Sequence, residues 1–413
     1  MVKRNERNGR AGRVAACLVA ACMAALSVSN PAPLRRWAEA AQDEAALLAS
    51  PAGPASSCVI AAVDAGSRRV IGSWPWPDET VARLVGRISR GNPRAIGIVP
   101  CPVSAGGGSM LAEAVRRAGN VAAGYGLAFG PRPATEGPPP PEGSRIRYVT
   151  NPWGKARAPR MPAAAGTRCL DAAVAEAAAA SGFSPFPSAA GPDGSAARAL
   201  SLVVAAGDSY LMSLPVAVAS VAMQTDRVTL RLKGESVEGV GLNGRLIPTD
   251  ARGMIRLRPG AYARPPVVPA SGILLDDASP GLWEGKIVLV GETEATPPRL
   301  SRGRLSVGAP PILLCAETID ALISGDCLRR SRLSALSEIL LAAIFPFAAR
   351  RLFSRPGWAW LKAGLFAAAL CACAGASVAA LLIWGEEFGP FYPALSAVVS
   401  WALYAGWAAC RSS

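Results

Sequence analysis

The sequence contains no histidine. Histidine serves most often as a general base and as a metal ligand, so its absence excludes Ser-His-Asp and Cys-His catalytic systems and histidine-ligated metal sites. None of the ten cysteines belongs to a C-x-x-C pair, which argues against a zinc cluster. We therefore predict that the protein is not an enzyme, and we expect no catalytic residues, no metal site and no cofactor.

The cysteines leave two interpretations open. Five of them lie in hydrophobic segments, where cysteine behaves as a small apolar residue. The other five are scattered through the middle of the chain, and Cys315 and Cys327 are the nearest pair among them in sequence. These residues are either buried free thiols or, if this region is exported, partners in one or two disulfides.

The formal net charge of +14 would suit a nucleic-acid partner. Most of this charge flanks hydrophobic segments, however, because it lies in the first thirteen residues, in the stretch 350–362 and at Arg411. Positive residues at such positions mark the cytoplasmic ends of membrane segments. We therefore predict the lipid bilayer as a partner and no binding to nucleic acid.

A run of sixteen small or apolar residues, 14–29, follows the basic N-terminus. This run is short for a spanning helix, which needs about 20 residues. Three interpretations stay open: a retained membrane anchor, a signal peptide with Ser27 and Ser29 before the cleavage point, or lipidation at Cys22. A short helix with one apolar stripe, 34–48, and a Pro-Gly-Ser-rich linker then lead away from the membrane.

Three hydrophobic spans lie near the C-terminus, at about 333–349, 363–384 and 391–410, and each is compatible with crossing a bilayer core about 30 Å thick. The loop between the first two spans is basic, and the loop GEEFGP between the last two is acidic. The positive-inside rule then predicts a cytoplasmic C-terminus and a large domain outside. Glu338 lies within the first span, and we predict an interfacial or helix-packing role for it rather than proton transport.

The stretch before these spans begins with alternating strand and helix patterns. The apolar runs 58–64 and 95–100 are typical of buried strands, and the rigid corner WPWP at 74–77 precedes a helix at 78–89. A further helix and a further strand follow before residue 128. Such alternation predicts an α/β fold with a mostly parallel or mixed sheet.

The middle of the chain has a different character. A proline-rich insert at 131–166 cannot continue helix or strand, so we predict an exposed loop there. The segment 228–260 alternates like strands, and its Asn243-Gly244 pair is a strong hairpin signal. It also contains GVGLNG, which matches the nucleotide-binding motif G-x-G-x-x-G. That motif must be followed by a helix, whereas a strand pattern interrupted by proline follows here. We reject a nucleotide site.

The hydrophobic run KIVLVGETEA, at 286–295, is typical of a central strand. Ligands of open α/β sheets bind beyond the carboxyl ends of the strands. This rule makes Asp64, at the end of the first strand, a candidate ligand-binding residue together with Gly291 and Glu292. Alternatively, Asp64 caps a turn and Gly291 permits a tight bend.

Four runs resemble the type-two CHASE domain, the cyclase and histidine-kinase associated sensory extracellular module: VIAAVDAGSRRVIGSWPWPDETVARLVGRISRGNPRAIGIV, MLAEAVRRAGNVAAGYGL, GKIVLVGETEA and AETIDALISGDCLRR. The resemblance covers roughly residues 55–330. It implies a bacterial sensor with an N-terminal anchor, an extracytoplasmic domain, three membrane helices and a cytoplasmic cyclase or kinase output domain. It also implies that Asp64, Trp74 and Trp76 define the fold and line a ligand pocket.

The sequence departs from this family pattern in three places. PCPVSAGGG follows the second strand, where relatives usually carry acidic residues and a phenylalanine. Asp78 follows WPWP, where an arginine is frequent. The sequence ends three residues after its last span, so we expect no output domain on this chain.

We therefore predict an α/β extracytoplasmic sensor domain and a C-terminal three-helix transmembrane bundle in a bacterial inner membrane, with a cytoplasmic C-terminus. The predicted parts are a cytoplasmic basic tail with a membrane anchor or signal (1–36), a juxtamembrane helix and linker (37–57), the sensor domain (58–330) and three transmembrane helices (331–413).

The first functional hypothesis is a non-catalytic membrane sensor. It would respond to a small molecule or a protein and signal through a separately encoded cytoplasmic kinase or cyclase, as a monomer or a homodimer. The second hypothesis is an envelope structural or assembly factor whose outer domain binds other proteins without signalling. The third is a hydrolase using Ser and Asp, for which the sequence supplies no activated nucleophile.

Overall fold

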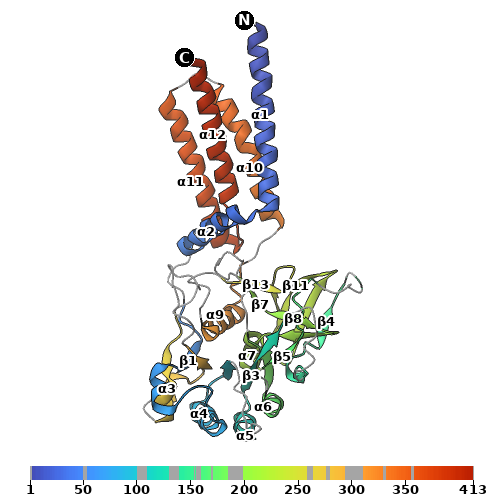
Figure 1. Cartoon of the computed structure of the whole chain (residues 1–413), viewed down its shortest axis with the longest axis vertical. Coiled ribbons are helices and arrows are strands. Elements are labelled where there is room, and N and C mark those ends of the chain that lie inside the picture. The colour runs from blue at the N-terminus through green and yellow to red at the C-terminus, as the bar shows by residue number, and fades with distance from the viewer. Residues whose placement is uncertain are drawn as a thin grey trace. The chain divides into compact units, whose positions relative to one another are not determined.

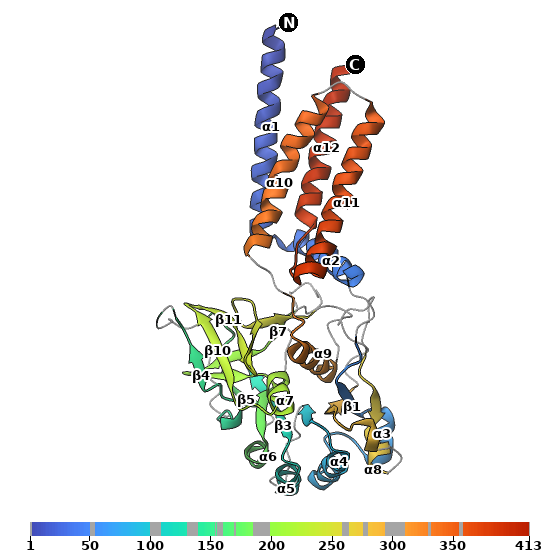
Figure 2. The same cartoon turned by 180° about the vertical axis from the view of Figure 1, so that it is seen from behind.

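A computed structural model of the chain divides it into two compact units, one formed by Met1–Pro51 with Leu328–Ser413 and the other by Ala52–Cys327. We call them the helical unit and the α/β unit; Figures 1 and 2 show their elements. The structure describes residues 2–49, 54–99, 109–129, 139–152, 154, 160–168, 171–184, 199–257, 264–275, 280–293, 310–328, 332–354 and 358–412.

The α/β unit is built on one seven-stranded sheet. All of its pairings are parallel except the one between β3 and β5, so the predicted mostly parallel or mixed sheet is confirmed. The strand order is β14 (Val267–Pro269), β1 (Cys58–Val63), β15 (Ile287–Glu292), β2 (Ala95–Val99), β3 (Val121–Ala128) and β5 (Gly166–Arg168), with β6 (Ala180–Phe183) also paired to β3.

The strand β15 enters the middle of this sheet, although it is the last strand in the chain. Its register pairs Cys58 with Ile287 on one side and Ala95 with Ile287 on the other. The strand is buried over all but its last residue, as a central position requires. The central strand predicted from the apolar run at 286–295 is therefore confirmed.

Helices cover one face of the sheet: α4 (Asp78–Arg90), α5 (Ser109–Ala118), α6 (Ala172–Ala177) and α8 (Ala270–Leu274). In α4 the four buried residues recur at helical spacing, so the helix is held by one apolar stripe. Alternate residues of the strands, such as Ile96 and Ile98 of β2, point into this core.

The other face of the sheet packs against α7 (Leu214–Ala222) and α9 (Pro311–Ser324). Almost every residue of α7 is buried, because the helix lies between the sheet, α9 and the remaining strands. Gly97 of β2 permits this close approach, since a Cβ there would lie 2.8 Å from Cγ2 of Val218. The α/β unit is therefore a sheet covered on both faces.

A second group of strands completes the unit. A four-stranded sheet has the order β12 (Arg245–Pro248), β11 (Ser236–Leu242), β10 (Val228–Lys233) and β4 (Tyr148–Thr150), and two pairs join β13 (Met254–Arg256) to β7 (Ala199–Ser201) and β8 (Val203–Ala206) to β9 (Ser209–Met212). Asn243 and Gly244 turn between β11 and β12 with φ of 49° and 76°, as a two-residue hairpin requires. The predicted hairpin is confirmed.

The proline-rich insert at 131–166 contributes more to the fold than we predicted. Residues 139–152 contain a 3-10 helix, η1 (Glu142–Ser144), and β4, which pairs in parallel with β10. Ser144 and Ile146 are buried. Residues 131–138, the first part of this insert, lie outside the described residues.

The helical unit contains α1 (Val2–Ser29), α2 (Ala32–Ala49), α10 (Arg332–Phe353), α11 (Ala359–Trp384) and α12 (Phe391–Ser412). Figures 1 and 2 show α1, α10, α11 and α12 side by side as a bundle. Among the described residues, three helical segments are long and apolar enough to cross a membrane: Ala11–Ser29, Leu333–Phe353 and Trp360–Ile383.

The predicted span at 391–410 forms α12, which is not among these three segments. Its polar side chains have partners inside the bundle: the Tyr392 hydroxyl donates to Asn30 Oδ1 at 2.8 Å, and the Tyr404 hydroxyl donates to the Gly12 carbonyl at 3.0 Å. Ser396 donates to the backbone of α10 at 2.6 Å. The polar composition of α12 therefore follows from its packed position, where hydroxyl groups bond across helices.

Glu338 of α10 is buried and accepts a hydrogen bond from the backbone N–H of Gly389 at 2.6 Å. The Ser377 hydroxyl of α11 donates to the neighbouring Phe388 carbonyl at 2.7 Å. These bonds fix the connection between α11 and α12 against α10. Glu338 thus has the helix-packing role that we predicted.

Candidate functional site

The predicted site begins at the carboxyl ends of β1 and β15, which are adjacent and parallel. Asp64 follows β1 directly, and Oδ1 of its side chain accepts a hydrogen bond from the Ser67 N–H at 2.7 Å. It is therefore the N-cap of a short helix, α3 (Ala65–Ile71), where we had expected only a turn. The cap holds the Asp64 carboxylate against the start of α3.

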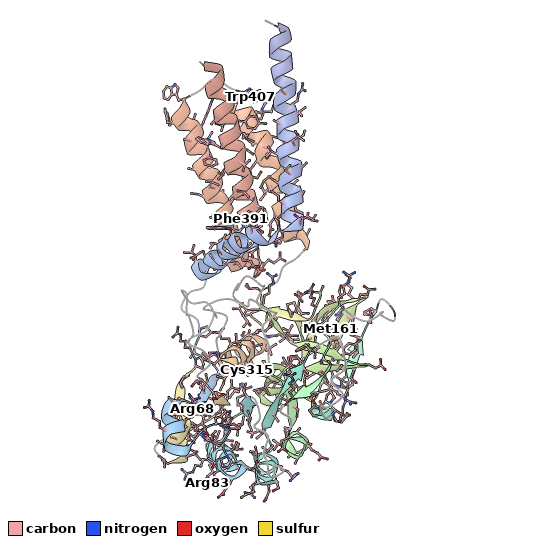
Figure 3. All side chains as sticks on the ribbon, in the orientation of Figure 1. Arg68, Arg83, Met161, Cys315, Phe391 and Trp407 are labelled. Atoms are coloured by element: carbon pink, nitrogen blue, oxygen red, sulfur yellow. The ribbon has the colours of Figure 1, made fainter. Side chains whose placement is uncertain are left out.

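Glu292 ends β15 opposite Val63 of β1. Its Oε1 lies 3.2 Å from Nη1 of Arg68, which projects from α3, and both side chains are partly exposed. Figure 3 labels Arg68 on this helix. An exposed pair of this kind contributes about 0–1 kcal/mol, so it orients the two groups more than it stabilises the fold.

Gly291 lies inside β15 rather than at a bend. A Cβ at this position would lie 2.1 Å from the Val99 carbonyl oxygen of the neighbouring strand β2. Only glycine fits such an approach without a shift of the backbone. The close packing of β15 against β2 therefore requires glycine at position 291, at the edge of the sheet where Asp64 and Glu292 lie.

The tryptophans of WPWP form a second structure. The rings of Trp74 and Trp76 meet edge to face, with centroids 5.4 Å apart, and the peptide bond between Trp74 and Pro75 is cis. Trp76 is buried, and its indole N–H donates to the Gly72 carbonyl at 2.8 Å. Trp76 lies in the hydrophobic core between α4 and the sheet, and the partly buried Trp74 packs against this core. The two rings therefore cover this face of the sheet.

The structure thus brings Asp64, Gly291 and Glu292 to one edge of the sheet and holds the two tryptophans in the neighbouring core. Residues 100–108 and 294–309, which follow β2 and β15 at the same edge, lie outside the described residues. Described residues form four cavities in the α/β unit, and none of the five predicted residues lines any of them. Their role in ligand binding stays a prediction.

A buried carboxylate joins the two ends of the α/β unit. Asp320 of α9 accepts a hydrogen bond from the Ser56 hydroxyl at 2.6 Å and another from the Ser57 N–H at 2.8 Å. Ser56 and Ser57 immediately precede β1, whereas α9 is the last helix of the unit. We call this contact the Asp320 clamp.

Burial raises the pKa of several ionisable side chains near the Asp320 clamp. Burial, together with the negative charge of Asp320, raises the pKa of Glu317 to about 7, although the nearby Arg264 opposes this shift. Burial also raises the pKa of the Cys58 and Cys315 thiols, and that of Cys327 to about 12. All three cysteines are free, so the Cys315–Cys327 disulfide is not formed and the free-thiol interpretation holds for them.

A polar cavity lies at the opposite, amino-terminal edge of the sheet. Its volume is about 600 Å³, within the range of small-molecule sites. It is lined by Arg94 just before β2, Asn120 just before β3, Arg145 and Arg147 after η1, and Gln224 just after α7. We call it the arginine cavity.

Three further cavities lie in the α/β unit. One, of about 420 Å³, lies between β3 and β9; half of its lining residues are alanine or glycine, and it shares Arg145 with the arginine cavity. Another, of about 670 Å³, runs between α4 and α5, where Figure 3 labels Arg83. The third, of about 420 Å³, adjoins the arginine cavity and shares Arg94 and Gln224 with it.

Sequence reasoning missed the arginine cavity because it examined only the carboxyl edge of the sheet. The available signal was modest: Arg94 and Asn120 each stand directly before a buried strand. Their convergence with Arg147 depends on the pairing of β4 with β10, which the sequence did not indicate.

No group of three or more Cys, Asp or Glu side chains among the described residues could hold a metal ion. Comparison with known families matches residues 15–350 to the model of the CHASE2 domain. No curated protein and no solved structure matches the chain.

Proposed function

Because the chain belongs to the CHASE2 domain family, a family of sensory extracellular domains, we propose that it is an integral membrane sensor that signals through a separately encoded partner. The α/β unit receives the stimulus outside the cytoplasm. The partner is a cytoplasmic kinase or cyclase, and the bundle of the helical unit carries the signal to it. The protein is not an enzyme in this proposal.

The Asp320 clamp is the observation that carries the proposal. The α/β unit is connected to the helical unit by two chain segments, one before β1 and one after α9. Asp320 ties these segments together with two hydrogen bonds from a buried position. A stimulus that moves α9 relative to β1 therefore acts on both connections at once, which is what a transmitting domain needs.

The composition of the helical unit supports a membrane location with a defined direction. Three apolar segments can cross a bilayer. Trp37 of α2 is 68% exposed, and Trp358 and Trp360 at the start of α11 are 70% and 65% exposed, as in the aromatic belts at membrane surfaces. The basic residues Arg350 and Arg351 favour a cytoplasmic position for the loop between α10 and α11 in a bacterial inner membrane.

The test is the recovery of partners with the full chain, tagged at its C-terminus and solubilised gently from membranes. We expect a cytoplasmic kinase or cyclase to co-purify with the wild type and to be lost from the Arg350→Ala/Arg351→Ala variant. The matched control is Arg116→Ala/Arg117→Ala, which removes the same charge from exposed positions on α5. Recovery of envelope proteins alone, unaffected by the loop substitutions, would contradict the sensor and favour an assembly role.

A further inference from the structure

We propose that the arginine cavity binds the stimulus, and that this stimulus is a small carboxylate that also carries hydroxyl or amino hydrogen-bond donors. The inference rests on the proposed sensor function and names the ligand class and the site for it. It moves the expected site from the carboxyl edge of the sheet to the amino edge.

The charge of the cavity favours an anion. Three arginines and two acidic residues, Glu142 and Asp226, line it, and Oε1 of Glu142 lies 2.8 Å from Nη1 of Arg145. Asp226 is exposed, as is Arg147, and the three positive and two negative side chains leave the lining with a net charge of +1. Arg94 uses Nη2 to donate to the Ala222 carbonyl at 3.0 Å, which leaves most of its five donors available.

Guanidinium groups bind carboxylates through two parallel hydrogen bonds, and such charge-assisted bonds are among the strongest in proteins. Arg94 and Arg147 stand on different elements, one before β2 and one before β4. A carboxylate between them would therefore join the large sheet to the four-stranded sheet.

Two polar atoms of the lining residues have no protein partner among the described residues. They are Nε of Arg145, a donor, and Oδ1 of Asn120, an acceptor. The amide group of Asn120 is oriented by its Nδ2, which donates to the Pro93 carbonyl at 2.8 Å. Buried polar atoms without partners destabilise a fold by about 1–3 kcal/mol each. Both atoms are themselves buried, so a ligand gains this free energy if its binding turns the two side chains toward it.

These two atoms give the cavity a preference for particular hydrogen-bonding groups in addition to its preference for negative charge. The donor at Arg145 needs an acceptor, as a carboxylate supplies, whereas the acceptor at Asn120 needs a hydroxyl or amino donor. Hydroxy acids, amino acids and sugar acids carry both kinds of group, and inorganic sulfate carries acceptors only. The cavity thus distinguishes among anions by hydrogen bonding as well as by charge.

The position of the cavity also explains how a ligand would act. Ser220, Val221 and Gln224, at the end of α7, form one wall of it. The helix α7 packs against α9 in one continuous core, and α9 carries Asp320. A ligand that shifts the end of α7 would therefore also shift α9, the helix that carries Asp320.

The direct test is isothermal titration calorimetry on the full chain in detergent micelles. The probes are malate, glutamate and glucuronate, with glucose as a neutral control and sulfate as an anion without donors. We expect at least one of the three carboxylates to bind at least tenfold more tightly than sulfate, and glucose not to bind. Binding should weaken at least tenfold in Arg147→Ala and in Asn120→Asp, because one variant removes a cation and the other adds an anion.

Arg117→Ala, which changes an exposed arginine on α5 outside the cavity, is the matched control and should bind like the wild type. Circular dichroism and thermal unfolding verify that each variant folds. Absence of binding by all three carboxylates, or equal binding by wild type and Arg147→Ala, would overturn the inference. The sensor itself is tested separately, because partner recovery that depends on Arg350 and Arg351 supports it even if no carboxylate binds.

Discussion

Asp320 and Ser56 are joined by a hydrogen bond of 2.6 Å, although 264 positions separate them in the sequence. The bond is buried and links the last helix of the α/β unit to the segment that enters its first strand. A charged group buried in this way holds its partners in one geometry, because the bonds are strong and few alternatives exist for the carboxylate.

Asp320→Ala should lower the stability of the protein by about 2–4 kcal/mol, because it leaves the buried Ser56 O–H and the partly buried Ser57 N–H without their acceptor. Thermal unfolding of the purified full chain measures this change. The matched control, Asp208→Ala, alters an exposed aspartate in the turn between β8 and β9 and should stay within about 0.5 kcal/mol of the wild type. Equal unfolding of both variants would contradict the structural importance of the clamp.

Glu317 should make stability depend on pH. Its pKa is raised from the ordinary value of 4.5 to about 7, mainly by burial, with Asp320 adding to the shift and Arg264 opposing it. Because the raised pKa means that the folded state binds the proton more tightly, this group favours folding below about pH 4.5, and its contribution is lost as the pH rises to about 7. The loss is on the order of 1–3 kcal/mol and levels off above pH 7.

Glu317→Gln keeps the shape of the protonated side chain and should flatten this part of the pH profile. Thermal unfolding of wild type and variant between pH 4.5 and 8 gives the comparison. Glu176→Gln, at an exposed position of α6, should keep the wild-type slope. If the slope persisted unchanged in Glu317→Gln, another group would be responsible.

Gly291→Ala should destabilise the α/β unit by about 1–3 kcal/mol or more, because its Cβ would lie 2.1 Å from the Val99 carbonyl oxygen and the backbone must shift. Gly86→Ala is the control, since a Cβ at this position of α4 meets nothing within 4 Å. Alanine favours helix over glycine, so Gly86→Ala should be neutral or stabilising by up to about 1 kcal/mol. Chemical denaturation of both variants separates the two effects, and a neutral Gly291→Ala would show that β15 and β2 can move apart.

Much of the fold could be predicted from the sequence, because local patterns decided it. The helical spacing of Val81, Leu84, Val85 and Ile88 fixed the buried face of α4, and the apolar run at 286–295 indicated the central position of β15. The hairpin at Asn243-Gly244 followed from the positive φ that both residues tolerate. In each case the necessary information lies within a few consecutive residues.

Other features escaped prediction because distant residues decide them. The short helix α3 is an exception, because the Ser67 N–H that caps it on Asp64 is local, and we expected only a turn there. The strand β4 follows a proline-rich run and forms only because β10 lies beside it. The arginine cavity likewise depends on strand pairing that brings Arg94, Asn120 and Arg147 together, and no local pattern encodes that meeting.

The N-terminal helix provides the last prediction. Gly12 of α1 accepts a hydrogen bond from Tyr404 of α12 at 3.0 Å, and a Cβ at Gly12 would lie 2.8 Å from the ring of Trp407, which Figure 3 labels. Close approach of two helices at a small residue is a common mode of packing in membranes. We therefore predict a retained anchor rather than a cleaved signal peptide or lipidation at Cys22.

Gly12→Val should therefore separate α1 from α12 and destabilise the purified protein by about 1–3 kcal/mol, while intact mass spectrometry of the wild type should give the uncleaved, unlipidated chain. Gly406→Ala, at a position of α12 where a Cβ meets nothing within 4 Å, should leave stability nearly unchanged. A mature protein that begins after residue 29, or that carries a lipid on Cys22, would contradict the retained anchor. In the cleaved case Gly12→Val would also leave the unfolding of the mature protein unaffected, because the substituted residue would no longer be part of it.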